Sequence, residues 1–285
     1  MDRIFVIDKH YLDAGKEFFS PVEYKYHINK LAPKSFDEIS IIDGEDVSAL
    51  PEKSNILSAE SQNICKVVPV GGIPFVQSIL AKIAENEDVF DKDMTPLEVP
   101  SPLHPFLNRD YEVVLGSELL DGGPIDSTWW FVKDAAFLKS WNSFIQEGDL
   151  RRFIDKDKTY VISKKVAFKS EWRAFVFDGE IEGCQNYSGD AATFPDEMTL
   201  RKMVEIYSDG ECPGAYTLDV GVVAEKEEWY ERKDVSGVEA VDDVLFGSTI
   251  PIEVHPFVSC GLYGFNSHKL LDMLESGWDW YLQGS

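Results

Sequence analysis

The chain has 285 residues, of which 44% are hydrophobic and 13% aromatic, so it can bury the core of one large domain or of two to three small ones. Its longest apolar runs, such as residues 174–177, fall far short of the roughly 20 residues that a membrane helix needs. The 51 acidic and 27 basic residues give a net charge of −24, which repels nucleic acid and anionic membranes. These features predict a soluble protein that binds neither nucleic acid nor membrane.

The N-terminus and the cysteines indicate a cytoplasmic protein. The start, Met1-Asp2-Arg3, lacks the basic region and the long apolar stretch of a signal peptide, and residues 4–7 are typical of a first strand. The four cysteines lie far apart and show neither a CxxC pair nor zinc-finger spacing. We therefore expect reduced thiols.

Residues 1–95 are predicted to form a small α/β domain. We expect its strands at residues 4–7, 39–42 and 67–70, and its clearest helix at 75–84, where apolar residues recur at helical spacing. From residue 86 to 105 the composition becomes acidic and rich in proline. This change predicts an irregular connection to a second domain, which would span residues 96–285.

The second half of the chain is richer in strands. Asp178-Gly179 lies between two β-rich runs and is a strong hairpin signal. Residues 225–243 are densely charged and acidic, which predicts a solvated excursion between two strands. The expected elements are strands at residues 171–177, 180–187, 216–223 and 249–257, and a closing helix at 267–274.

Three polar residues in the last two predicted strands are candidates for binding a metal ion. Successive side chains of a strand point to opposite faces, so Glu253 and His255 share one face, and Asp219 points away from the apolar face of its own strand. If the two strands pair, the three side chains converge, and two carboxylates suit a hard cation such as Mg²⁺. Alternatively, all three are ordinary solvent-facing residues of half-exposed strands.

Lysine and arginine side chains are candidates for binding phosphate. Lys133 ends an apolar strand and Lys139 follows six residues later. A lysine at a strand end can present its charge to a phosphate, or it can extend into solvent along apolar surface. Glu171 and Arg173 are expected on one strand face, where Arg173 could clamp a phosphate or a carboxylate, or could simply pair with Glu171.

The order of these features along the chain resembles the ATP-grasp fold. The matching segments are Lys133, Tyr160-Val161-Ile162-Ser163, Glu171-Trp172-Arg173, Leu218-Asp219-Val220-Gly221 and Ile252-Glu253-Val254-His255. The closest likeness is to a clade of small bacterial and phage ATP-grasp proteins marked by one arginine and two lysines, here Arg173, Lys133 and Lys139. The resemblance covers roughly residues 95–275 and implies an α+β ATP-grasp domain with nucleotide between two lobes, preceded by a small α/β pre-grasp domain.

The resemblance also implies ATP and Mg²⁺ as cofactors. Lys133 and Lys139 would contact the phosphates, residues 160–163 would form the adenine hinge, and Glu171 would belong to the nucleotide site. Arg173 would face the γ-phosphate or an acyl phosphate. The residues that would hold Mg²⁺ are Asp219 and Glu253, with His255 as a third candidate ligand.

Three departures from the family pattern limit this transfer of roles. His255 stands where the family's E-x-N motif has asparagine, and a histidine can either ligate or orient a metal. The interval from Asp219 to Glu253 is longer than a tight hairpin needs, which predicts an acidic insertion near the site. The loop between Lys139 and Tyr160 contains a single glycine, Gly148, so a glycine-rich cover for the phosphates is poorly represented.

The implied function is an ATP- and Mg²⁺-dependent carboxylate–amine ligase. ATP would convert a carboxylate into an acyl phosphate, and attack by an amine would give an amide, ADP and phosphate, with both substrates being small molecules or peptides. Two alternatives stay open. The chain could be an acidic binding protein on an ATP-grasp scaffold with a basic protein partner, which the His255 departure favours, or an ATP-dependent kinase of a small molecule.

Overall fold

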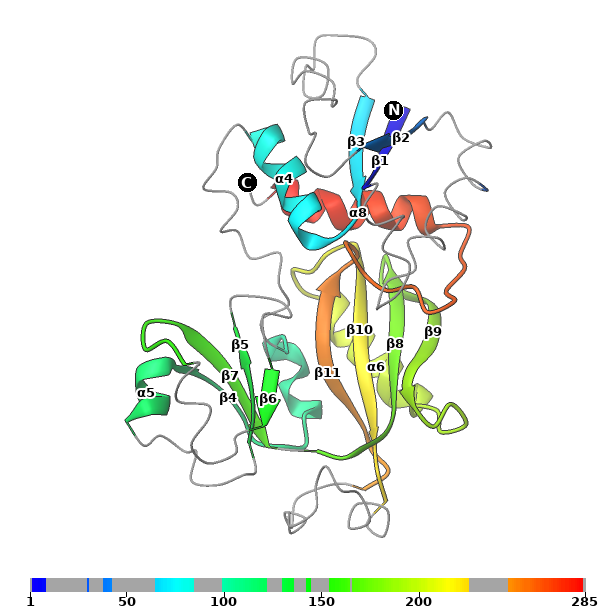
Figure 1. The fold of residues 1–285 in the computed structure, drawn as a ribbon. Coiled ribbons are helices and arrows are strands. Elements are labelled where there is room, and N and C mark those ends of the chain that lie inside the picture. The colour runs from blue at the N-terminus through cyan, green and yellow to red at the C-terminus, as the bar shows by residue number, and fades with distance from the viewer. Residues whose placement is uncertain are drawn as a thin grey trace.

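The protein combines helices with three separate β-sheets (Figure 1). The computed structural model describes residues 2–8, 30, 38–42, 65–84, 99–121, 130–135, 142–144, 154–164, 166–225 and 246–283. The predicted domain boundary near residue 95 and most of the acidic excursion at 225–243 lie outside the described residues, so both stay predictions. No described helix has both the length and the apolar character needed to cross a membrane.

The N-terminal sheet is parallel and has the order β2-β1-β3. Parallel strands need crossover connections, which is why residues far apart in sequence meet in this sheet. The three predicted strands and the predicted helix are all confirmed, with small differences at their ends. The bounds are β1 (Asp2–Asp8), β2 (Glu38–Ile42), β3 (Cys65–Val70) and α4 (Ile73–Ala84).

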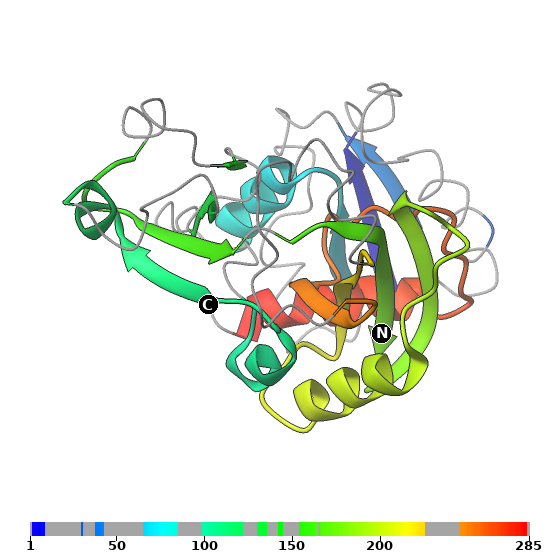
Figure 2. The ribbon, with the colours of Figure 1, turned by 90° about the horizontal axis from the view of Figure 1, so that it is seen from below.

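The second sheet is antiparallel, has the order β4-β7-β5-β6, and forms a small lobe beside the central sheet (Figures 1 and 2). Trp130 and Val132 of β5 belong to the core of this lobe, so the alternation of side chains turns Lys133 to the other face. The bounds are η4 (Ser101–Phe106), β4 (Tyr111–Leu115), α5 (Gly116–Leu120), β5 (Trp130–Asp134), β6 (Asn142–Phe144) and β7 (Thr159–Lys164).

The central sheet is antiparallel, with the order β11-β10-β8-β9. The predicted hairpin is confirmed: Asp178 and Gly179 have φ of 49° and 78°, as a two-residue type I′ turn requires. Helix α6 covers one face of this sheet, where its Leu200 and Met203 pack against Trp172 and Leu218. The bounds are β8 (Phe168–Phe177), β9 (Glu180–Gly189), α6 (Glu197–Ser208), β10 (Ala215–Val223) and β11 (Thr249–Pro256).

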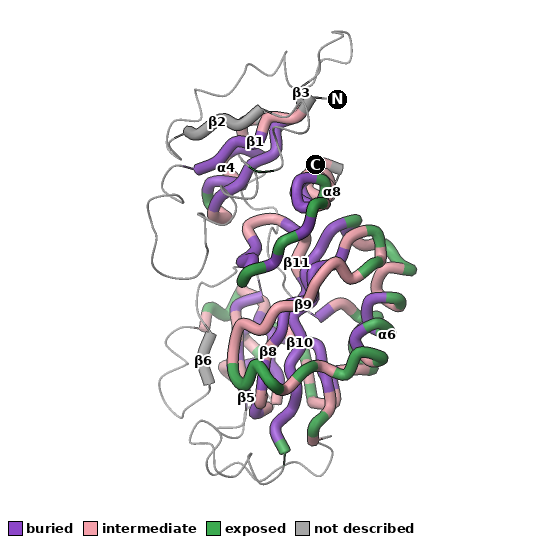
Figure 3. Tube along the Cα trace, turned by 90° about the vertical axis from the view of Figure 1, so that its right-hand side faces the viewer, coloured by how far each residue is buried: buried purple, intermediate pink, exposed green. Residues whose placement is uncertain are grey.

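The C-terminal helix α8 (Leu270–Gln283) lies between the N-terminal sheet and the central sheet (Figures 1 and 3). Its Trp278 is fully buried in a core that also includes Val68 of β3 and Phe257. Lys66 of β3 donates hydrogen bonds to Glu275 at 2.8 Å and Asp279 at 2.6 Å. The predicted closing helix at 267–274 was therefore wrong at both ends, since the helix begins later and runs well past residue 274.

A glycine in the middle of α8 permits the close approach of this helix to the chain after β11. A Cβ added at Gly277 would lie 2.5 Å from the carbonyl oxygen of Phe257. Glycine in a helix interior normally costs about 1 kcal/mol relative to alanine, so sequence reasoning favours a helix end here. The packing against Phe257 outweighs that preference.

Gly277→Ala is therefore expected to destabilise the protein by about 1–3 kcal/mol, since overpacking outweighs the gain in helix propensity. The measurement is the free energy of unfolding in denaturant. Gly210→Ala is the control, because its added methyl group meets nothing nearer than the Tyr207 carbonyl oxygen at 3.6 Å. A Gly277→Ala variant that is as stable as the wild type would contradict the close approach.

Candidate functional site

A row of charged side chains crosses the face of the central sheet that lies opposite α6. Arg173 of β8 is directly opposite Asp219 of β10, and Asp219 is directly opposite Glu253 of β11. Residues opposite one another on antiparallel strands point to the same face, so the three side chains are neighbours. Arg173 is 8% exposed and Asp219 is 1% exposed. The alternative that these residues are ordinary solvent-facing ones is therefore wrong for both.

Arg173 and Asp219 form a buried, two-pronged ion pair. Arg173 Nε donates to Asp219 Oδ1 at 2.7 Å and Nη2 donates to Oδ2 at 2.8 Å, while Nη1 donates to the Gly261 carbonyl oxygen at 3.3 Å. Burial disfavours the charge, but Asp219 outweighs it and raises the pKa of Arg173 above its ordinary value. The guanidinium thus fixes the position of the Asp219 carboxylate. A contact of Arg173 with phosphate stays a prediction.

Glu171 does not pair with Arg173, contrary to the simple ion-pair alternative. Its carboxylate accepts a hydrogen bond from the Tyr187 hydroxyl at 3.0 Å. The rings of Tyr187 and Tyr263 lie 5.8 and 5.3 Å from the Arg173 guanidinium. Two tyrosines therefore cover the arginine on this side.

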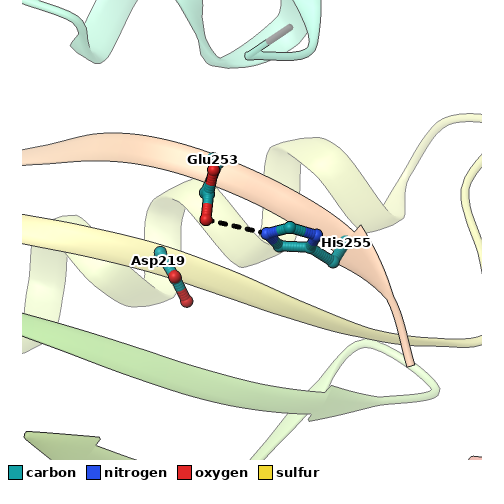
Figure 4. A group of neighbouring side chains, drawn as sticks. All are labelled: Asp219, Glu253 and His255. Atoms are coloured by element: carbon teal, nitrogen blue, oxygen red, sulfur yellow. Dashed lines mark ion pairs between the residues drawn. The ribbon is translucent and has the colours of Figure 1, made fainter. Parts of the chain in front are cut away.

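Asp219, Glu253 and His255 form a cluster of the kind that binds metal ions (Figure 4). One potential ligand atom from each residue lies within 4.8 Å of the others, and His255 Nε2 lies 2.8 Å from Glu253 Oε1. The convergence predicted from strand alternation is confirmed. A bulge in the pairing of β10 with β11 follows immediately at Val220, so the regular register ends at this cluster.

The electrostatics of the cluster favour an ionised Glu253. Burial alone would raise the pKa of Glu253, but His255, Lys133 and Arg173 hold it well below its usual range. Burial raises the pKa of Asp219; Arg173 opposes this effect, and the Glu253 carboxylate adds to it. Two carboxylates this close repel one another, and a bound cation would relieve that repulsion.

Lys133 brings the small lobe to the cluster. Its Nζ lies 3.6 Å from Glu253 Oε2, so a side chain of β5 reaches a side chain of β11 in another sheet. The chain thus places one lysine and two carboxylates together from opposite lobes. Lys139, the second predicted phosphate ligand, lies outside the described residues.

The predicted adenine hinge lies inside β7. Tyr160, Val161, Ile162 and Ser163 are paired with β4 on one side and with β5 on the other. Backbone groups of these residues are engaged in both ladders, so a hinge that bonds adenine would need groups at the end of β7. The hinge at residues 160–163 stays a prediction.

Sequence reasoning missed Tyr187 and Tyr263 as neighbours of the site. Tyr187 reaches the polar face because the pairing of β8 with β9 has a bulge at Glu171, and no sequence pattern shows that bulge. Tyr263 follows β11, has a φ of 49°, and is flanked by Gly261 and Gly264. A bulky residue in the left-handed region is uncommon, and the two flanking glycines are the only sequence signal for it.

The comparisons with known proteins agree with this geometry. A family model matches residues 124–273, which is more than half of the chain. It describes an ATP-grasp domain, namely family 2 of the clade that is named for one arginine and two lysines. No curated protein matches the sequence. The thiols of Cys184, Cys212 and Cys260 are free, as expected.

Three solved structures illustrate the fold. D-alanine–D-alanine ligase from Bacillus anthracis is 15% identical, with 100% of each chain covered and a TM-score of 0.55. ATP-grasp ligase PsnB in complex with a minimal precursor is 11% identical, with 96% of this chain and 99% of PsnB covered and a TM-score of 0.52. The D-alanine–D-alanine ligase from Coxiella burnetii is 12% identical, with 100% and 97% covered and a TM-score of 0.51. This chain has the ATP-grasp fold and belongs to family 2 of the one-arginine, two-lysine clade of ATP-grasp domains.

Proposed function

We propose that this protein is an ATP-dependent carboxylate–amine ligase. The observation that carries the proposal is the meeting of Lys133 from the small lobe with Glu253 and Asp219 from the central sheet. A lysine can hold a phosphate as a point charge, and carboxylates can hold a divalent cation that also contacts phosphate. The site therefore suits the phosphates of a nucleotide.

The cluster fits the divalent cation that such a reaction needs. Its donors are two carboxylates and an imidazole, and His255 Nε2 is buried without a hydrogen-bond partner among the described residues. Asp219, Glu253 and His255 would hold the cation, which neutralises phosphate charge when it is bound. The Arg173 pair keeps Asp219 in place for this role.

The chain's own residues would position the reactants and oppose developing charge. Lys133 would bind the γ-phosphate while a carboxylate oxygen attacks its phosphorus and ADP leaves. An amine would then attack the carbonyl carbon of the acyl phosphate, lose a proton and expel phosphate, leaving an amide. D-alanine–D-alanine ligase was solved with ATP and PsnB with a precursor peptide and AMPPNP. We extend a nucleotide and a small-molecule or peptide substrate to this chain.

The test follows a labelled oxygen. Amino acids and peptides are first screened for stimulated release of ADP, and the active carboxylate is then labelled with oxygen-18. One labelled oxygen is expected in the released phosphate, because the carboxylate oxygen that attacks phosphorus leaves with it. AMP as the nucleotide product would indicate adenylation instead. Label retained in a stable phosphorylated product would indicate a kinase, and an absence of turnover would favour a binding protein.

A further inference from the structure

We propose that His255 makes the metal site selective for a first-row transition ion over Mg²⁺, and that Mn²⁺ is the ion that fits it best. The inference rests on the proposed function only in that it concerns the same site. It assigns a role to the one position at which this chain has a nitrogen donor where the E-x-N pattern has an amide. The role is selection of the metal.

The first argument is the spacing of the donor atoms. His255 Nε2 and Glu253 Oε1 are 2.8 Å apart. Neighbouring ligands of an octahedral ion with bonds of about 2.1 Å lie about 3 Å apart, because they subtend a right angle at the ion. The two atoms are therefore spaced as adjacent ligands of one ion. Asp219 supplies a third atom, with all three within 4.8 Å of one another.

The second argument is the unmet need of the imidazole nitrogen. The His255 side chain is 12% exposed, and its Nε2 is buried. The short contact with Glu253 lacks the alignment of a hydrogen bond, so Nε2 has no hydrogen-bond partner among the described residues. A buried polar atom in this state costs free energy, and a bond to a metal would remove that cost.

The third argument is the chemistry of the donors. Mg²⁺ strongly prefers oxygen ligands in octahedral geometry and keeps several waters. Imidazole binds transition ions well, whereas carboxylates suit Mg²⁺ and Mn²⁺ alike. Mn²⁺ shares the oxygen preference that Asp219, Glu253 and a phosphate require, and as a transition ion it also accepts the His255 nitrogen. Asparagine at this position would offer oxygen and remove the distinction.

The experiment measures Mn²⁺ binding by electron paramagnetic resonance. Loss of the signal of free Mn²⁺ gives its dissociation constant, and competition by Mg²⁺ gives the constant for Mg²⁺, with and without the non-hydrolysable nucleotide AMPPNP. Pulsed measurements on the bound ion detect a directly bonded nitrogen. The variant is His255→Asn, and the matched control is His268→Asn, which makes the same change at an exposed histidine.

The wild type is expected to show a bonded nitrogen that His255→Asn loses, together with a fall of at least about tenfold in the preference for Mn²⁺ over Mg²⁺. His268→Asn should keep both properties. Identical spectra and preference in His255→Asn, or no Mn²⁺ binding in either condition, would overturn the proposal. An imidazolium that only pairs with Glu253 would give the first of these results. A nitrogen-bonded Mn²⁺ in a protein that never turns over ATP would preserve the inference and remove the ligase function.

Discussion

Lys133→Ala is expected to lower ATP turnover by at least about 100-fold, in line with the loss of a group that stabilises charge in the transition state. In the structure Lys133 Nζ is 3.6 Å from Glu253, so the change removes the only described cation that the small lobe presents to the cluster. The fold should survive, because Val132 and Trp130 form the core on the other face of β5. Turnover is measured as ADP release, and folding by the thermal midpoint of unfolding.

Two further variants make the result specific. Lys133→Arg keeps the charge but not the shape of the group, so it should retain part of the activity. Lys202→Ala removes an exposed lysine that pairs with Glu205 on α6 at 2.9 Å, and it should change turnover less than about twofold because exposed pairs contribute little. A folded Lys133→Ala variant with unchanged turnover would remove Lys133 from the mechanism.

The parts of the fold that could be predicted are those written into local patterns. Alternation along 216–223 and 249–257 puts Asp219, Glu253 and His255 on one face, and the structure keeps that arrangement. Asp178-Gly179 fixes the hairpin because both residues tolerate positive φ. These features need only neighbouring residues and one strand pairing.

The pairing of Arg173 with Asp219 could not be predicted in the same way. Strand β9 follows β8 in a hairpin, so β9 is the natural candidate to pair with the next strand, but β10 crosses over and pairs with β8 instead. Helix α6 makes that crossover, and its apolar pattern did not stand out in the sequence. Local patterns therefore placed Arg173 on the right face with the wrong partner.

The same limit applies to the small lobe. Strand β7 lies between β4 and β5, so its backbone is engaged on both sides, whereas the sequence suggested a free hinge at residues 160–163. Strand order is a property of the whole fold, because it depends on how the connections between strands cross the sheet. Periodicity alone does not contain it.

The role of Arg173 leads to the second large effect, which is on stability. Arg173→Leu should reduce the free energy of unfolding by about 3–5 kcal/mol, because it leaves the Asp219 carboxylate buried without its partner. Replacing both residues by leucine should cost much less, since no unpaired charge then remains in the interior. The free energies of unfolding of Arg173→Leu, Asp219→Leu and the double variant form a cycle that measures the coupling.

Arg201→Leu is the matched control for this cycle. Arg201 pairs with Glu197 at 2.9 Å, but both side chains are exposed, so its loss should change the free energy of unfolding by less than about 1 kcal/mol. The contrast tests whether Arg173 supports Asp219 or acts on phosphate. If Arg173→Leu were as stable as the wild type yet inactive, the arginine would act on the substrate, and its pairing with Asp219 would contribute little to the fold.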